Sequence, residues 1–210
     1  MAQRTRLVPA LLALALLGGC AASADPTSTK PITTTTRPAT SDAAFVHLEQ
    51  QFNANLGVYA LDTGTGRSVT YRADDRFAYD STYKLLMAGL LLRKDTDAEL
   101  ATGVHYTSAE LQSYSPITGQ HVATGMSVSD LIAAALRYSD NTAANLLLAQ
   151  LGGPSGLQAA VRGIGDAITH VDRGEPNVNT SIPGDIRDTS TPRSLGSDLR
   201  GFVLGDWLNA

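Results

Sequence analysis

Residues 139–147 read Ser-Asp-Asn-Thr-Ala-Ala-Asn-Leu-Leu, a short polar run that passes directly into an apolar one. Helical patterns lie on both sides of the polar triplet 139–141, which is therefore expected to form a turn between two helices. Asn141 is of a residue type that caps helix N-termini, and it is predicted to cap the helix over 142–151, which stops at Gly152. The turn thus presents short polar side chains at a helix junction.

An S-x-x-K motif lies upstream at Ser81-Thr82-Tyr83-Lys84, at the predicted start of a helix over 81–92. Residues three apart share one helical face, so the Lys84 amine can reach the Ser81 hydroxyl. A serine is a poor nucleophile until a neighbouring base takes its proton, and a helix N-terminus offers a backbone N–H to a developing oxyanion. The motif therefore predicts a nucleophile at Ser81.

A third polar segment, residues 173–189, has the composition of a long functional loop. Glu175 and Asn179 can hold one water between a carboxylate and an amide. Arg173 and Asp188 could pair across the base of the loop as structural residues, the alternative being two separately solvated charges.

Together these three segments resemble class A β-lactamases, in which S-x-x-K, S-D-N and a later K-T-G recur. The likeness runs from about Phe45 to Ala210 and includes Tyr114-Ser115-Pro116-Ile117-Thr118. It implies an α+β fold of the β-lactamase/transpeptidase type, with an antiparallel sheet flanked by helices and an all-helical subdomain. It also implies hydrolysis of β-lactam antibiotics, and hence antibiotic resistance, without a metal or organic cofactor.

The resemblance assigns catalytic roles to the matching residues. Ser81 would open the β-lactam carbonyl and become acylated, with Lys84 beside it. Either Lys84 or Glu175 acting through a water would remove the serine proton, whereas Glu175 would be the base for deacylation. Ser139 would relay a proton to the lactam nitrogen.

Substrate-binding roles follow from the same resemblance. Asn141 would hydrogen-bond the acylamide side chain of the substrate, and Asn179 would help to hold the hydrolytic water. Tyr114 would wall the pocket beside the ring, simple surface packing being its alternative. A cis peptide bond between Glu175 and Pro176 is also implied.

One family motif is missing, because no K-T-G occurs and no lysine follows Lys94. In the family that triplet lies on a C-terminal strand beside the active site. We therefore expect residues 42–210 to form an incomplete domain that lacks the C-terminal strands of the sheet, with impaired turnover. Two alternatives stay open, a DD-peptidase-type penicillin-binding protein and a non-catalytic fragment. Glu175 with Asn179 argues against the first, because a loop that delivers water suits turnover.

Within the domain, residues 42–76 are predicted to form a helix and a β-hairpin, and residues 77–210 to be mainly helical. The hairpin strands are expected over 56–61 and 68–71. An isolated hairpin is marginal in water, so at least a third strand should join it, although no strand is evident after residue 76. The other expected helices run from about Asp42, from Ser127 to near Tyr138, around 157–164, and from Thr191 to about Leu204.

The first twenty residues are typical of an export signal. Arg4 and Arg6 precede an apolar run over 7–17 that is too short to span a bilayer. The run ends Leu-Gly-Gly-Cys20, which resembles a lipobox, so residues 1–19 would be removed and Cys20 would carry lipid. Cleavage after Ala24 instead would release a secreted or periplasmic protein. Residues 20–41 are rich in Thr and Pro and are predicted to be a tether.

Composition excludes several other classes of function. The chain of 210 residues is 43% apolar and 17% charged, as in ordinary globular proteins, and its net charge of −4 without a Lys/Arg cluster disfavours nucleic-acid binding. A single cysteine allows no internal disulfide, and four histidines without metal-ligand spacing make a zinc site unlikely. The expected partners are a β-lactam substrate and, through Cys20 alone, a membrane, and the chain is expected to be a monomer.

Overall fold

The computed structural model describes residues 39–208, with side chains from residue 42 onward. By its contacts the chain divides into Met1–Thr34 and Thr35–Ala210. The first unit lies outside the described residues, as do the predicted signal peptide, Cys20 and the tether as far as residue 38. Within residues 39–208, no helix combines the length and the apolarity that crossing a membrane requires.

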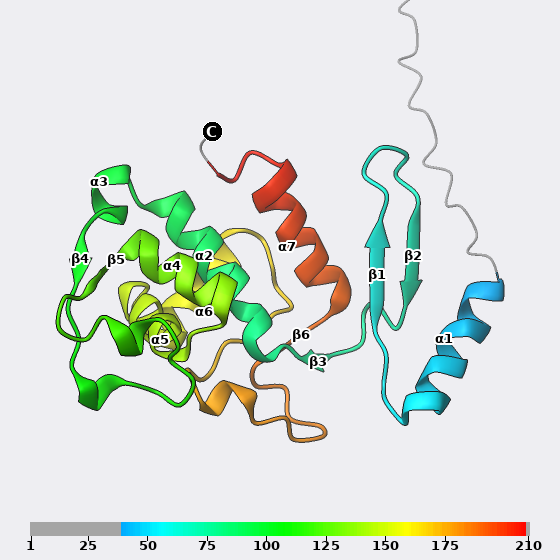
Figure 1. Ribbon diagram of the computed structural model, residues 1–210. Helices are drawn as coiled ribbons and strands as arrows, with labels where there is room; N and C mark the ends of the chain where they lie inside the picture. The colour runs from blue at the N-terminus through cyan, green and yellow to red at the C-terminus, as the bar shows by residue number, and fades with distance from the viewer. Residues whose placement is uncertain (1–38, 209–210) are drawn as a thin grey trace, which may run out of the picture. The chain divides into compact units, whose positions relative to one another are not determined.

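The described part is α+β, with helices predominating over small antiparallel sheets (Figure 1). The helices are α1 (Ala39–Phe52), α2 (Tyr83–Lys94), α3 (Asp97–Leu100), α4 (Val128–Tyr138), α5 (Asn141–Gln150), α6 (Gly153–Gly163) and α7 (Pro192–Leu204). The strands are β1 (Val58–Leu61), β2 (Ser68–Tyr71), β3 (Phe77–Ala78), β4 (Gly103–Val104), β5 (Met126–Ser127) and β6 (Thr189–Ser190). Short 3-10 turns cover Asp80–Thr82, Ser108–Glu110, Thr118–Gln120 and Asn177–Asn179.

The predicted hairpin is present as the antiparallel pair β1 and β2, in which Val58 faces Tyr71. Among residues 39–208, the expected third strand does not join it. Helix α7 packs against β1 instead, and Gly196 of α7 makes this possible. A Cβ at Gly196 would lie 2.6 Å from the Tyr59 ring, so only glycine lets the ring approach the helix backbone.

The expectation that no strand follows residue 76 is wrong. Strand β3 pairs with β6, Phe77 facing Ser190, and β4 pairs with β5, Val104 facing Met126. Each of these strands is two residues long. The alternation of apolar and polar residues that reveals a strand needs at least four residues, so it cannot appear in a pair.

Helix α2 occupies the centre of the core and packs against α4, α5, α6 and α7 (Figure 1). Its sequence is apolar on every side, as a helix surrounded by others requires. Gly89 of α2 lets the Phe202 ring of α7 lie close, because a Cβ there would be 2.7 Å from the ring. This central helix begins at the site, since Lys84 is in its first turn and Ser81 lies two residues before its start.

Candidate active site

Ser81 lies in the 3-10 turn Asp80–Thr82, directly before α2, rather than in the α-helix itself. Asp80 enters the turn with a positive φ of 44°, a conformation that costs free energy for a residue with a side chain. The turn and the first turn of α2 bring the two residues of the S-x-x-K motif together, and Lys84 Nζ donates to Ser81 Oγ at 3.1 Å.

Lys84 is buried and contacts every catalytic residue that the sequence predicts. Its Nζ donates to the Ser139 carbonyl oxygen at 2.8 Å and to Ser139 Oγ at 3.1 Å. It also donates to Asn141 Oδ1 at 2.8 Å and lies 3.0 Å from Glu175 Oε1. The side chains of Lys84 and Glu175 are 3% and 0% exposed, so this ion pair is shielded from water. A buried ammonium requires such acceptors, because an unpaired buried charge is strongly destabilising.

Ser139 follows α4 in the left-handed conformation, with φ 54° and ψ 31°. Its Oγ donates to Ser81 Oγ at 2.9 Å, so Lys84 Nζ and the two serine hydroxyls form a closed set of contacts. A proton can therefore move among an amine and two hydroxyls without a diffusing water.

The turn that carries Ser139 is held by Asp140, and here the sequence-based prediction of the cap is wrong. Asp140, not Asn141, caps α5, its Oδ1 accepting from the Ala143 N–H at 2.9 Å. The fully buried Asp140 carboxylate also accepts from the Ile117 and Thr118 N–H groups. Asn141 is the first residue of α5, and its side chain is free to face Lys84.

Asn141 joins the turn to the segment that contains Tyr114. Its Nδ2 donates to the Ser113 carbonyl at 3.0 Å, and its backbone N–H donates to the Tyr114 carbonyl at 3.1 Å. The Tyr114 side chain is 67% exposed and its φ is 63°. The backbone thus places Tyr114 beside the S-D-N turn with its ring open to solvent.

Glu175 is held at both its backbone and its side chain. Its N–H donates to Asn145 Oδ1 and its carbonyl accepts from Asn145 Nδ2, each at 2.9 Å. Asn179 Nδ2 donates to Glu175 Oε2 at 2.7 Å. The peptide bond between Glu175 and Pro176 is cis, which confirms that prediction. Glu175 therefore presents one oxygen to Lys84 and the other to an amide.

Asn145 is a positioning residue that was not singled out from the sequence. The available signal was its place four residues after Asn141 on α5, since such residues lie on one helical face. Gly174 also acts here, because a Cβ at that position would lie 2.9 Å from Asn145 Oδ1. The absence of a side chain at Gly174 thus gives Asn145 access to the Glu175 backbone.

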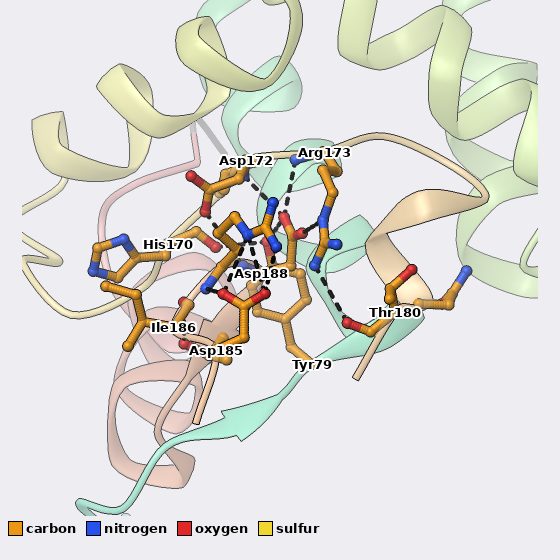
Figure 2. A network of polar contacts seen from close by, with 12 residues as sticks. Tyr79, His170, Asp172, Arg173, Thr180, Asp185, Ile186 and Asp188 are labelled. Carbon is orange, nitrogen blue, oxygen red and sulfur yellow. Dashed lines mark hydrogen bonds and ion pairs between the residues drawn. The ribbon is translucent and has the colours of Figure 1, made fainter. Parts of the chain in front are cut away.

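The base of the loop is closed by a buried network around Asp188 (Figure 2). The Arg173 guanidinium pairs with the Asp188 carboxylate, which is 1% exposed. Asp188 Oδ1 also accepts from the Asp172 N–H at 2.8 Å and the Arg173 N–H at 3.0 Å, and the Tyr79 hydroxyl donates to it at 3.3 Å. Arg173 Nη2 reaches across to the Thr180 carbonyl. In the structure Arg173 and Asp188 therefore form an ion pair and are not two separately solvated charges.

Burial near negative charge keeps two tyrosines protonated at the edge of the site. Burial first, and then the Asp188 carboxylate, raises the pKa of Tyr79. Burial first, and then Glu175 and Asp188, raises the pKa of Tyr83, which is the third residue of the S-x-x-K motif. Both tyrosine hydroxyls therefore keep their protons.

Chemically, the site joins a serine hydroxyl to a buried amine, a second hydroxyl and a carboxylate. The amine and the carboxylate supply a route for the serine proton, and the second serine can pass a proton to a leaving group. No group of three or more His, Cys, Asp or Glu side chains within the part of the chain that the structure describes could hold a metal ion.

Comparison with known proteins points to one family. A family model described as the beta-lactamase enzyme family matches residues 41–210. A beta-lactamase of Amycolatopsis lactamdurans is 55% identical over 164 residues, which are 78% of this chain and 54% of the relative. Beta-lactamase AST-1 of Nocardia asteroides is 48% identical over 215 residues, covering 100% of this chain and 68% of the relative.

Solved structures agree with the sequence relatives. The crystal structure of a class A beta-lactamase from Clostridium kluyveri has a TM-score of 0.81 and 47% identity, and the match covers 82% of this chain and 66% of that chain. A halotolerant bacterial beta-lactamase has a TM-score of 0.78 and 46% identity, over 79% of this chain and 64% of that chain. Against the Amycolatopsis relative, the chain spans about half of the length.

Proposed function

Because the chain belongs to the β-lactamase enzyme family, we propose that its site hydrolyses β-lactam antibiotics through an acyl-enzyme on Ser81 and thereby confers resistance. The observation that carries this proposal is the contact of Lys84 Nζ with Ser81 Oγ at 3.1 Å and with Glu175 Oε1 at 3.0 Å. The amine thus links the nucleophile to the carboxylate that would later activate water.

Acylation begins with attack of Ser81 Oγ on the lactam carbonyl carbon. Lys84 Nζ first gives a proton to Glu175 Oε1, 3.0 Å away, and then takes the serine proton, or Glu175 takes the serine proton through a water. The Ser81 backbone N–H stabilises the developing oxyanion. Ser139, within hydrogen-bond distance of Ser81, delivers the proton to the lactam nitrogen as the C–N bond breaks.

Deacylation uses the other face of the same site. Glu175 takes a proton from a water that Asn179 helps to hold, and the resulting hydroxide attacks the acyl carbonyl carbon. The bond between that carbon and Ser81 Oγ then breaks, and the proton held by Glu175 returns to Ser81 Oγ. Asn179 Nδ2 lies 2.7 Å from Glu175 Oε2, which supports this division of work. Asn141 binds the acylamide side chain of the substrate, and Tyr114 forms a wall of the pocket.

Turnover of a chromogenic cephalosporin by the full chain tests the proposal. We expect turnover that Ser81→Ala abolishes and that Lys84→Met lowers about 10²–10⁴-fold, the usual contribution of a positioned acid or base. Lys94→Met is the matched control, because Lys94 is exposed and pairs only with its neighbour Asp95 among the described residues. Equal activity of the wild type and Ser81→Ala would contradict the proposal.

The Glu175→Gln variant separates the two half-reactions. It keeps the shape of the side chain but cannot accept a proton. Because Glu175 is the only proposed base for deacylation, we expect acylation to slow and deacylation to slow far more, so that one burst of product per enzyme is followed by arrest. A wild-type chain that itself stops after the burst would favour the DD-peptidase alternative. A chain that is not acylated at all would favour a non-catalytic fragment.

We also propose that the chain is exported and acts at the cell envelope as a monomer. Residues 1–19 would be the signal peptide, Cys20 the lipid anchor and residues 20–38 the tether, and the catalytic region would begin with helix α1 at Ala39. The charged start, the apolar run and the Leu-Gly-Gly-Cys20 sequence support this layout. Lipid labelling that globomycin blocks and Cys20→Ala abolishes is expected. An unlabelled mature protein that begins at Asp25 would contradict the anchor.

A further inference from the structure

Two buried aspartates meet where α7 packs against the segment that follows α6. Asp166 of this segment is 6% exposed, and Asp198 of α7 is 4% exposed. The Oδ2 atom of each is buried and accepts no hydrogen bond from an N–H or O–H donor among the described residues. Both carboxyl groups line the same cavity, and a hydrogen-bonding contact between them is among the causes that raise the pKa of Asp198. Two carboxylates are both acceptors, so this contact requires a proton between them.

The surroundings decide which aspartate holds the proton. Asp166 Oδ1 accepts from the Ile168 N–H at 2.6 Å and the Thr169 N–H at 3.0 Å. Burial opposes ionisation of Asp166, but these donors, with Thr169 foremost, lower its pKa. Asp198 has no comparable donors among residues 42–208, and burial followed by the charge of Asp166 raises the pKa of Asp198 to about 8.

No cation neutralises the pair within the described residues. Asp74 and Arg193 line the same cavity as Asp166 and Asp198, but the Arg193 guanidinium is bound to Asp74 at 2.7 and 2.9 Å. Arg162 of α6 donates to the backbone carbonyl of Asp166, not to its carboxylate. The charge of the pair is therefore relieved by protonation of one member.

We propose that Asp198 keeps its proton in the folded protein at neutral pH and donates it to Asp166, as a carboxyl–carboxylate clamp between α7 and the segment that leads into the Glu175 loop. Next to Asp166, Thr169 Oγ1 contacts Ser190 Oγ at 2.7 Å and the His170 N–H donates to the Thr189 carbonyl at 2.9 Å. Loss of the proton places two negative charges in this buried junction and weakens it.

The clamp predicts a definite pH dependence. An unfolded aspartate titrates near 4, whereas Asp198 in the folded chain holds its proton to higher pH. At pH values between the pKa of an unfolded aspartate and the pKa of Asp198 in the folded chain, the folded chain binds one proton more than the unfolded chain. The free energy of unfolding therefore falls as pH rises, and it levels off once Asp198 is ionised. The unfolding constant of the wild type should therefore rise by up to about tenfold per pH unit relative to Asp198→Asn. The asparagine amide replaces the proton as donor and does not titrate.

The experiment is an NMR titration of the full chain with carbon-labelled aspartate carboxyls, combined with urea unfolding at several pH values. We expect one carboxyl signal with a midpoint near pH 8 that Asp198→Asn removes. Asp185→Asn, a control whose carboxylate pairs with Arg187, should leave that signal in place. Should Asp198→Asn fail to fold, the wild-type titration decides the question alone.

Three results would overturn the clamp. The first is a wild type in which every aspartate carboxyl titrates in the ordinary acidic range. The second is a ratio of the two unfolding constants that does not change with pH. The third is saturable stabilisation of the wild type, but not of Asp198→Asn, by added sodium or calcium chloride, since a cation would then be bound between the carboxylates. The clamp does not depend on the proposed catalytic function.

Discussion

Replacing Asp188 by asparagine is expected to loosen the base of the loop that carries Glu175. The Asp188 carboxylate is 1% exposed and pairs with Arg173, and it accepts two backbone N–H groups and the Tyr79 hydroxyl. An asparagine keeps one oxygen, but its amide nitrogen cannot accept a hydrogen bond from the guanidinium. Removal of one partner from a buried ion pair costs about 3–5 kcal/mol. Because the Arg173 side chain is 18% exposed and can rehydrate in part, we expect about 3 kcal/mol.

Thermal unfolding followed by circular dichroism measures this cost. For a domain of this size about 1 kcal/mol shifts the Tm by about 2–4 °C, so Asp188→Asn should lower it by about 6–12 °C. Asp185→Asn is the matched control, because Asp185 bonds to the exposed Arg187 two residues away and water can replace that contact. Equal shifts in the two variants would refute the view that the Asp188 network holds the loop.

Three further substitutions test other parts of the structure. Asp140→Ala leaves buried N–H groups of the S-D-N turn without an acceptor and should cost at least about 3 kcal/mol in urea unfolding. Gly89→Ala drives a Cβ into an aromatic ring of α7 and should cost about 1–3 kcal/mol, whereas Gly163→Ala, in open space, should not destabilise. Asn145→Ala frees the backbone of Glu175, so deacylation rates from single-turnover kinetics should fall more than acylation rates.

The helices could be predicted well because their signals are local. Thr191 followed by Pro192 marked the start of α7, which begins at Pro192 and ends at the predicted Leu204. The start of α5 was placed one residue late, because Asp140 and Asn141 are both good caps. Contacts with Ile117 and Thr118, distant in sequence, decide that Asp140 takes the cap. Capping preferences describe only residues that are neighbours in sequence, so they do not predict such distant contacts.

The site was predictable only as far as its chemistry is carried by short motifs. Ser81 and Lys84 meet through the spacing of one helical turn, and S-x-x-K expresses that spacing directly. The role of Asn145 has no such pattern, since its partner Glu175 lies on a loop thirty residues away. The strands β3 and β6 could not be predicted for the same reason. Each is two residues long and forms through pairing with a distant segment, so neither shows an alternation of apolar and polar residues.

The buried Lys84 ammonium explains why three separate segments must converge. An isolated charge at this depth would be strongly unfavourable, so Lys84 requires acceptors from beyond its own helix. The left-handed Ser139 turns its carbonyl and hydroxyl toward Nζ, and the loop brings the Glu175 carboxylate. The same contacts supply a proton route to Ser81 and neutralise the cation that would otherwise destabilise the core. Stability and reactivity are therefore coupled at Lys84, and a change that displaces Glu175 should weaken both.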